Sequence, residues 1–254
     1  MHEGAGPYEA RVITCEMAAE NICALKLDFP PGITQRACPG QFAEILIPDD
    51  DGYHQLRRPF SVAGLRPGDT GALFYFRIQG AGTKRLAKSK SGDILSVLFP
   101  LGRGFTPPGP HERIWAVGGG TGVAAVLPLQ DIQDADITCF FGFRSRDEMF
   151  LPDGMKENVR LAFDTEGITA VDLVRQELEI SAPPARIVAC GPFPMYRALA
   201  RISSGIPTEI SLEERMGCGT GGCQACVVRV SGKFVRTCTD GPVFPLEEVD
   251  EIAG

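Results

Sequence analysis

Residues 216–226 read MGCGTGGCQAC and place three cysteines, Cys218, Cys223 and Cys226, within nine positions. A fourth, Cys238, follows after eleven further residues. The chain of 254 residues has nine cysteines, so this C-terminal segment is chemically different from the rest. Glycines separate the first cysteines, and residues without a Cβ bend tightly round a metal group with little strain. The stretch therefore predicts a metal centre with four cysteine ligands.

The spacing of the cysteines favours one kind of centre. C-x4-C-x2-C with a distant fourth cysteine is the plant-type ferredoxin spacing, and it indicates a [2Fe–2S] cluster. A structural zinc site is the alternative, but zinc usually takes two short cysteine pairs set well apart. We therefore predict an iron–sulfur cluster on Cys218, Cys223, Cys226 and Cys238. A zinc-stabilised binding module without enzyme activity is the alternative of another class.

The sequence before the first proline cluster is typical of β-structure. Short apolar runs rich in β-forming residues, at 42–47, 73–78 and 94–99, are bounded by Gly, Pro or Asp. Strands of this length without helices between them predict a closed antiparallel barrel over residues 1–106. Three prolines between Thr106 and Pro110 support neither a helix nor a central strand, so we expect a domain boundary there.

Residues 111–210 alternate between strand and helix patterns. We expect strands at 114–117, 137–141, 161–163, 186–189 and 208–212. We expect helices from a glycine-rich turn to about residue 132, over 171–178 and over 194–202. This alternation predicts a parallel α/β sheet covered on both faces. Residues 211–254 would form a small cluster lobe, with 227–230 as its clear strand.

A glycine-rich turn, Gly118-Gly119-Gly120-Thr121-Gly122, follows the first of these strands and opens a helix. Backbone N–H groups at such a turn bind phosphate well. A dinucleotide site also needs an acid at the end of the second strand to hold a ribose, but residues 139–144 read CFFGFR. The alternative is a tight strand–helix connection without a ligand.

Two other segments combine suitable groups. Cys190-Gly191-Pro192 ends a later strand and points to the same sheet edge as the glycine-rich turn, although Cys190 is also typical of a buried small hydrophobe. Arg58-Pro59-Phe60-Ser61 offers a cation, a ring and a hydroxyl on one extended stretch. An arginine fork suits a pyrophosphate and a ring suits a flavin face, whereas the alternative is a surface strand with a charged start.

Charge and hydropathy exclude several classes of protein. The net charge of −7 and the pI near 5.1 argue against nucleic acid as a partner. No run approaches the ~18 apolar residues of a membrane span, and the N-terminus lacks the pattern of a signal peptide. We therefore expect a cytoplasmic protein with neither a membrane nor a nucleic-acid partner.

Together and in this order, these segments resemble the ferredoxin reductase superfamily. The run from Ser211 to Gly219 into the cysteines is similar to the electron transfer subunits of NAD-linked dihydroorotate dehydrogenase B. The resemblance implies FAD at Arg58, Pro59, Phe60, Ser61, Tyr75, Phe76, Arg77, Gly82 and Thr83. It implies a nicotinamide nucleotide at Gly118, Gly119, Gly120, Thr121, Gly122, Cys190, Gly191 and Pro192.

The resemblance also implies an oxidoreductase role in pyrimidine biosynthesis. Electrons from the FMN of a separate catalytic subunit would cross the cluster and FAD to NAD⁺, in a heterotetramer of two copies of each subunit. All the motifs serve these cofactors, so we expect no dihydroorotate site on this chain. Subunits of cytoplasmic hydrogenases and of bifurcating ferredoxin:NADP reductases have the same three-part architecture and are alternatives. The choice of NAD or NADP stays open, because Arg144 and Arg146 could contact a 2′-phosphate.

Overall fold

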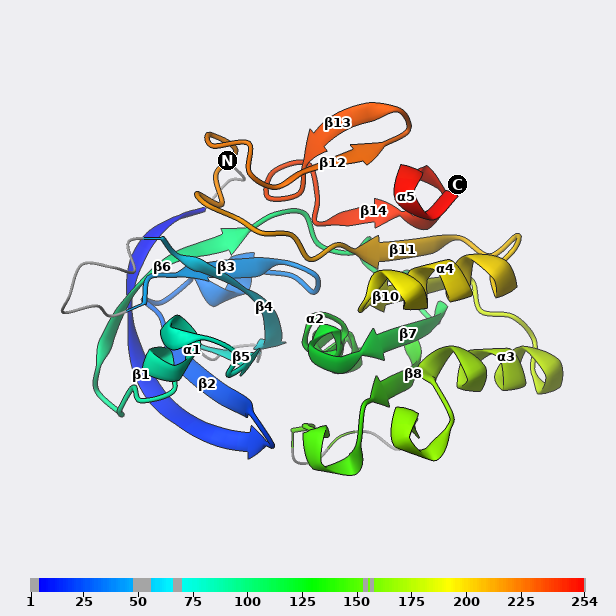
Figure 1. Ribbon diagram of the computed structural model, residues 1–254, viewed down its shortest axis with the longest axis horizontal. Coiled ribbons are helices and arrows are strands. Elements are labelled where there is room, and N and C mark those ends of the chain that lie inside the picture. The colour runs from blue at the N-terminus through cyan, green and yellow to red at the C-terminus, as the bar shows by residue number, and fades with distance from the viewer. Residues whose placement is uncertain (1–4, 48–55, 66–69, 153–154, 156–157, 254) are drawn as a thin grey trace.

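A computed structural model describes residues 5–47, 56–65, 70–152, 155 and 158–253. A β-barrel and an open sheet with helices lie side by side in it (Figure 1). A two-stranded hairpin near the C-terminus lies at one end of this pair (Figure 1). The architecture of barrel and α/β sheet that the sequence predicts is confirmed.

The barrel closes in the strand order β1-β2-β5-β4-β3-β6, and neighbouring strands are antiparallel. Successive side chains of a strand point to opposite faces, so Leu25 and Leu27 of β2 both reach the apolar interior. Its elements are β1 (Gly6–Ala19), β2 (Ile22–Asp28), η1 (Thr34–Arg36), β3 (Phe42–Ile45), β4 (Arg58–Leu65), β5 (Gly71–Arg77), α1 (Ala81–Leu86) and β6 (Ile94–Leu101).

The open sheet has the order β14-β11-β10-β7-β8-β9, in which β14 alone is antiparallel to its neighbour. One face carries α2 and the other carries α3 and α4, as the predicted alternation requires. The elements up to the cysteine loop are β7 (Arg113–Gly119), η2 (Gly120–Gly122), α2 (Val123–Val126), η3 (Leu127–Asp131), β8 (Asp136–Phe143), η4 (Arg146–Glu148), β9 (Val159–Phe163), η5 (Asp164–Glu166), α3 (Ala170–Ile180), β10 (Arg186–Cys190), α4 (Phe193–Ile202) and β11 (Thr208–Ser211).

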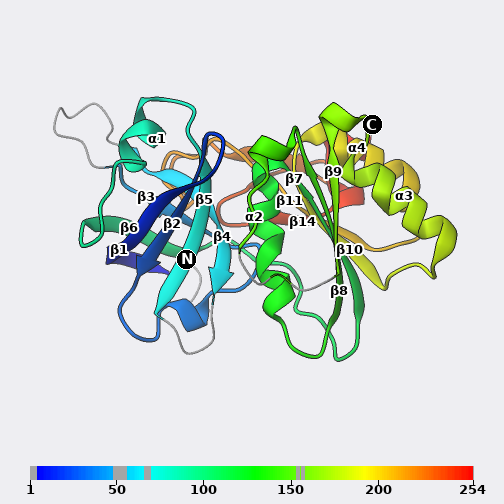
Figure 2. The same cartoon turned by 90° about the horizontal axis from the view of Figure 1, so that it is seen from below.

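The helix expected after the glycine-rich turn differs from the prediction. Three short helical segments, η2, α2 and η3, follow one another there, and α2 has only four residues. Pro128 explains the break, because proline lacks the N–H that continues an α-helix. This segment lies between the sheet and the barrel (Figure 2).

The C-terminal residues form a hairpin and then return to the sheet. β12 (Val227–Val230) and β13 (Lys233–Arg236) pair with each other, and β14 (Val243–Pro245) then pairs with β11. η6 (Leu246–Glu248) and α5 (Asp250–Ala253) follow, and their buried side chains pack in the core that α4 also covers. The sequence analysis identified neither β13 nor β14. The limits of the three parts stay a prediction.

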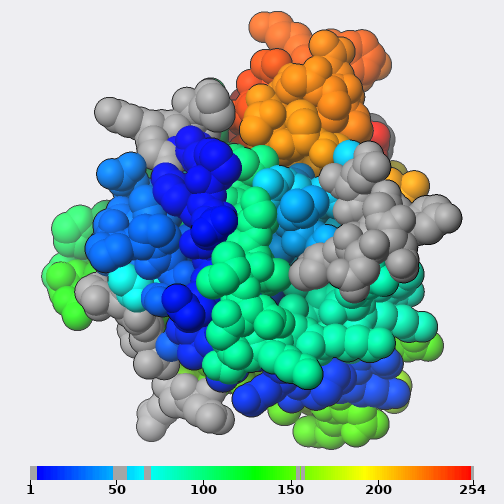
Figure 3. All heavy atoms as spheres, turned by 90° about the vertical axis from the view of Figure 1, so that its left-hand side faces the viewer, coloured from blue at the N-terminus to red at the C-terminus, as the bar shows by residue number. Residues whose placement is uncertain are grey.

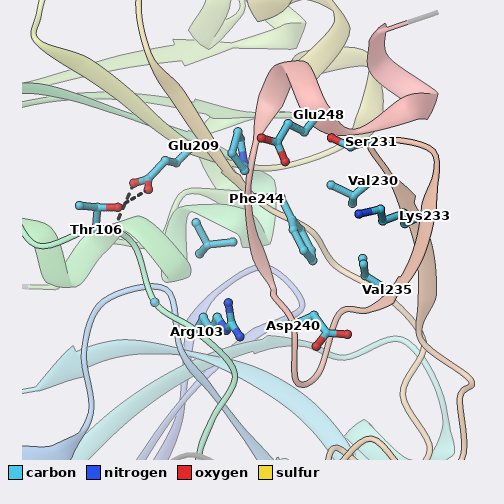
Figure 4. A pocket seen from close by; sticks show the side chains of 13 residues that line it. Arg103, Thr106, Glu209, Val230, Ser231, Lys233, Val235, Asp240, Phe244 and Glu248 are labelled. Atoms are coloured by element: carbon cyan, nitrogen blue, oxygen red, sulfur yellow. Dashed lines mark hydrogen bonds between the residues drawn. The ribbon is translucent and has the colours of Figure 1, made fainter.

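Two sets of contacts hold the barrel and the sheet together. Arg77 of β5 forms an ion pair with Glu148, with 2.8 Å between Nη2 and Oε2, and the Tyr75 ring lies 4.6 Å from that of Phe150. At the proline-rich connection, Thr106 donates hydrogen bonds to Glu209 (Figure 4). Glu209 also forms an ion pair with the buried Arg186. The connection is therefore fixed to the sheet through a partly buried carboxylate that is itself held by a buried arginine.

Candidate functional site

The four cysteines of the C-terminal segment lie against the outside of the barrel. Cys226 and Cys238 are buried with Phe42 of β3 and Leu101 of β6, whereas Cys223 is exposed. The same segment covers one end of the barrel in the space-filling view (Figure 3). Two of the four thiols therefore face the barrel, and at least one faces solvent.

The donors around these thiols suit a metal–sulfur group. The backbone N–H groups of Thr220 and Cys223 each lie 3.4 Å from the Sγ of Cys218. Burial raises the pKa of Cys218, but these N–H donors outweigh it and lower the pKa to about 6, which favours the thiolate that binds metal. Burial and the neighbouring Cys226 raise the pKa of Cys238 to about 12.

Whether the residues fit the cluster is decided by the donor set. Four cysteines, with N–H groups aimed at a sulfur, are the ligands that a [2Fe–2S] cluster takes. A cavity of about 210 Å³ lies beside Cys238 and Gly219, next to the end of β6. Among the described residues, no three Cys, His, Asp or Glu side chains come close enough together to hold a single metal ion. The fit rests on the identity of the donors and not on four thiols already gathered round one point.

Gly219 brings the cysteine loop close to the barrel. Its φ is +66°, and a Cβ there would lie 2.6 Å from Cγ of Glu44 and 3.1 Å from Cδ1 of Leu101. Only glycine meets both conditions without strain. The loop conformation and the approach to β3 thus depend on the same residue.

Glu44 of β3 is a residue that the sequence analysis missed. It is completely buried beneath Gly219, and its two carboxylate oxygens have no hydrogen-bond partner among the described residues. Burial, helped by the negative charge of Cys218, raises the pKa of Glu44 to about 7, against the opposing effect of Arg57 and Arg58. An acid inside the apolar run 42–47 was the available signal.

The two adjacent arginines at the start of β4, Arg57 and Arg58, have different surroundings. Arg57 donates from Nη1 to the carbonyl of Ser96 at 2.6 Å and from Nη2 to its hydroxyl at 2.9 Å. Arg58 donates to the backbone carbonyls of Leu56 and Arg57 at 2.9 and 3.1 Å. Arg57 therefore joins the start of β4 to β6, whereas the partners of Arg58 among the described residues are backbone carbonyls.

β4 and β5 bring most of the predicted flavin residues onto neighbouring strands. The rings of Phe60 and Phe76 lie 5.4 Å apart, and Phe76 belongs to the barrel core. Tyr75 and Arg77 instead face the α/β part through the contacts given above. Ser61 pairs with Phe42 across the strands, and Pro59 pairs with Glu44.

Gly82 and Thr83 lie apart from these strands, in α1. The hydroxyl of Thr83 accepts hydrogen bonds from the backbone N–H groups of Gln79 at 2.9 Å and Gly80 at 3.2 Å. Gly82 is buried, and a Cβ there would meet Ile47 at 3.8 Å. In this structure Thr83 therefore holds the turn before α1.

The two glycine turns of the sheet are packed against each other. A Cβ on Gly122 would lie 2.4 Å from the carbonyl oxygen of Cys190, and one on Gly119 would lie 3.0 Å from Cδ of Pro192. Gly191 likewise meets Gly119. Gly120, in contrast, has φ +55° and nothing within 4 Å of a Cβ position. Close packing explains most of these glycines, and Gly120 leaves bare backbone where a phosphate can approach.

Cys190 has a neighbour that the sequence analysis missed. Its Sγ donates to Oε1 of Glu213 at 3.9 Å, and burial holds the pKa of the Cys190 thiol well above its ordinary value. The Tyr196 hydroxyl accepts from the N–H of Gly191 at 2.9 Å and donates to the carbonyl of Ser211 at 2.7 Å. Glu213 follows β11, which lies beside β10, so adjacent strand ends bring the thiol and the acid together.

A cavity of about 690 Å³ lies elsewhere, between the connection after β6, the hairpin β12–β13 and β14 (Figure 4). Its lining mixes cations such as Arg103 and Lys233 with acids such as Asp240 and Glu248. None of the predicted cofactor residues lines it.

Comparisons of the sequence give a consistent result. Residues 213–250 match the family described as the iron–sulfur cluster binding domain of dihydroorotate dehydrogenase B. "Dihydroorotate dehydrogenase B (NAD(+)), electron transfer subunit" of Desulforamulus reducens is 34% identical over 260 residues, covering 95% of this chain and 97% of the relative. The protein of the same name from Shouchella clausii is 36% identical over 227 residues, covering 83% and 86%.

Solved structures support the fold. A chain of an NADH-dependent reduced ferredoxin-NADP oxidoreductase, studied for flavin-based electron bifurcation, has a TM-score of 0.79 and 28% identity, and covers 95% of this chain and 89% of its own. Phthalate dioxygenase reductase has the same fold, with a TM-score of 0.64, 14% identity and coverage of 89% and 87%. No described helix of the present chain is both long and apolar enough to cross a membrane.

Proposed function

Since this chain belongs to the family of electron transfer subunits of dihydroorotate dehydrogenase B, we propose that it passes electrons between a catalytic subunit and NAD⁺ through a [2Fe–2S] cluster and FAD. The resemblance found in the sequence is thereby confirmed. When bound, FAD exchanges a hydride with the nicotinamide and single electrons with the cluster, which no other group here can do together. The chain's own residues bind these groups and set their positions.

One observation supports the proposal most strongly. Phe42 packs with Cys226 and Cys238 on one side and is the register partner of Ser61 in β4 on the other. A single strand of the barrel therefore separates the cysteine loop from the segment proposed to bind FAD. Such a short separation is what an electron relay needs, and a distant structural metal site would not require it.

The other proposed roles follow from the geometry of each segment. Arg58 would bind the FAD pyrophosphate, because among the described residues its guanidinium contacts only backbone carbonyls, whereas Arg57 is bound to β6. Gly120 and its neighbours would bind the phosphates of NAD⁺ at the sheet edge. Cys190 and Glu213 would lie at the same edge, at the ends of β10 and β11.

The partner follows from the relay. The relatives' name, electron transfer subunit, implies a separate catalytic subunit. We propose that this subunit carries FMN, that it covers the cysteine loop near the exposed Cys223, and that the assembly is a cytoplasmic heterotetramer of two copies of each chain. Dihydroorotate would bind on the partner, because the recognised motifs of this chain serve the other cofactors.

A second candidate function has support of its own. The ferredoxin-NADP oxidoreductase chain is similar along nearly the whole length, at 28% identity. A subunit of that kind would have the same three cofactor sites but a different partner. The identity of the partner therefore distinguishes the two candidates.

The test begins with the purified chain, prepared without oxygen. We expect one FAD and two irons per chain, and stoichiometric zinc without iron would refute the cluster. The chain is then produced with and without the dihydroorotate-oxidising subunit of the same genome, and NAD-dependent formation of orotate is measured. Activity should need both chains. Activity of the isolated chain would contradict the division of roles, and failure of the two chains to associate would favour the second candidate.

A further inference from the structure

An ion pair lies at the carboxyl ends of β8 and β9. Nε of Arg146 is 2.7 Å from Oε1 of Glu166, and Nη2 is 3.1 Å from Oε2. The guanidinium carbon also lies 4.5 Å from the centroid of the Phe163 ring. Two parallel hydrogen bonds and a ring face together fix the plane of the arginine fork.

This pair occupies the place where a dinucleotide ribose is recognised. In open α/β sheets the ligand lies at the carboxyl ends of the strands, and the ribose is held at the end of the second strand from the phosphate turn. Here the turn follows β7, and β8 is that second strand, with Gly119 paired to Gly142. Arg144 directly follows β8, and its carbonyl accepts a hydrogen bond from the N–H of Thr165 at 3.1 Å. The loop after β9 is thereby attached to the end of β8.

The attachment supplies the acid that the sequence of β8 lacks. Residues 139–144 contain no carboxylate, but Glu166 comes to the same strand end from the loop after β9. In the sequence, Glu166 follows β9 and not β8. In the fold, it still lies at the end of β8, where the ribose of a dinucleotide is held.

We propose that Glu166 makes this nucleotide site select NAD over NADP, by occupying the Arg146 fork that would otherwise bind a 2′-phosphate. The inference rests on the proposed nucleotide site and names its specificity residue. A 2′-phosphate is best bound by a two-pronged edge of an arginine, and the Nε–Nη2 edge of Arg146 is already bound by the Glu166 carboxylate. The phosphate must displace Glu166 and is repelled by it.

The other charges at this edge act in the same direction. Among the described residues of the loops after β8 and β9, Arg144 and Arg146 face the acids Asp147, Glu148, Asp164 and Glu166, and Glu148 is already paired with Arg77. The Arg146–Glu166 pair is exposed, at 69% and 44% of the two side chains, so it contributes little to folding stability. Replacing Glu166 should therefore alter ligand preference and leave the fold intact.

The test measures the dissociation constants of NADP⁺ and NAD⁺ by calorimetry on the oxidised FAD-loaded protein. Glu166→Gln should strengthen NADP⁺ binding relative to NAD⁺ by about tenfold, the effect of gaining a charge-assisted contact. The double variant Glu166→Gln with Arg146→Ala should lose that gain, because the freed arginine supplies the contact. The ratio of kcat/KM for NADPH and NADH in dye reduction should change in parallel.

Asp136→Asn is the matched control. Asp136 lies at the opposite end of β8, is paired with Arg113 at 3.8 Å and is similarly exposed at 54%. Asp136→Asn also removes one negative charge that is paired with an arginine, but at the far end of β8, and the preference should stay unchanged. An unchanged preference in Glu166→Gln, or an equal gain in Asp136→Asn, would overturn the proposal. Failure of the parent protein to bind either nucleotide would instead overturn the nucleotide site itself, and this inference with it.

Discussion

Replacing Gly219 with alanine tests how the cysteine loop is held on the barrel. Gly219 has φ +66°, which costs an alanine about 1–2 kcal/mol. The new methyl group would also lie 2.6 Å from Cγ of Glu44, a side chain that is completely buried and has no space to turn into solvent. Forcing an extra methyl group into such packing costs roughly 1–3 kcal/mol. The closed loop should therefore lose about 2–5 kcal/mol of stability.

A loss of about 2 kcal/mol, the lower end of that range, shifts the equilibrium between the closed and the open loop about thirtyfold. The measurement is the iron content per chain, with the rate at which a chelator removes iron from anaerobic protein. We expect Gly219→Ala to lose iron at least ten times faster than the parent. The fluorescence of the single tryptophan, Trp115 in the core of the sheet, should stay unchanged and show that the rest of the chain is folded.

Two other glycines serve as controls that separate the backbone strain at Gly219 from the steric overlap with Glu44. Gly222, in the same loop, has no positive φ and nothing within 4 Å of a Cβ position, so Gly222→Ala should keep its iron. Gly232, in the hairpin turn, has φ +75° and open space, so Gly232→Ala carries the backbone strain alone and leaves the cysteine loop untouched. If Gly219→Ala retains iron as well as Gly222→Ala does, the loop does not lie on Glu44 and Leu101 in the way described here.

Three further predictions concern other parts of the chain. Arg58→Ala should weaken FAD binding about ten- to hundredfold with unchanged iron content, measured by flavin titration, and unchanged affinity would make Arg58 a surface residue only. Cys226→Ser should stop electron transfer to the partner but spare NADH-dependent dye reduction, whereas Cys15→Ser should preserve both; loss of dye reduction in Cys226→Ser would indicate a structural cluster. Arg186→Met, which removes a buried charge with 8% side-chain exposure, should lower the free energy of unfolding in urea by ~2–3 kcal/mol, against less than ~0.5 for the exposed Arg175→Met. Equal effects of these two arginine changes would contradict the buried network.

The sequence alone determined the features that depend on spacing along the chain. The barrel and the α/β sheet follow from strand length and from the presence or absence of helices between strands, and both are confirmed. The cysteine spacing predicted the kind of centre, and the family that matches residues 213–250 is described as an iron–sulfur cluster binding domain. The turns at Gly120 and Gly191 could also be located from the sequence, because each lies between a strand pattern and a helix pattern.

Only the tertiary structure decided which distant residues become neighbours. Glu44 precedes Gly219 by 175 positions and yet lies beneath it, and the pairing of β14 with β11 depends on a chain reversal that no local pattern marks. Glu213 meets Cys190 because two strands are adjacent in the sheet, and Glu166 reaches the end of β8 because one backbone hydrogen bond joins two loops. Local propensities act over a few residues, whereas these contacts depend on how whole elements pack, so the sequence could identify the segments but not the acids placed beside them.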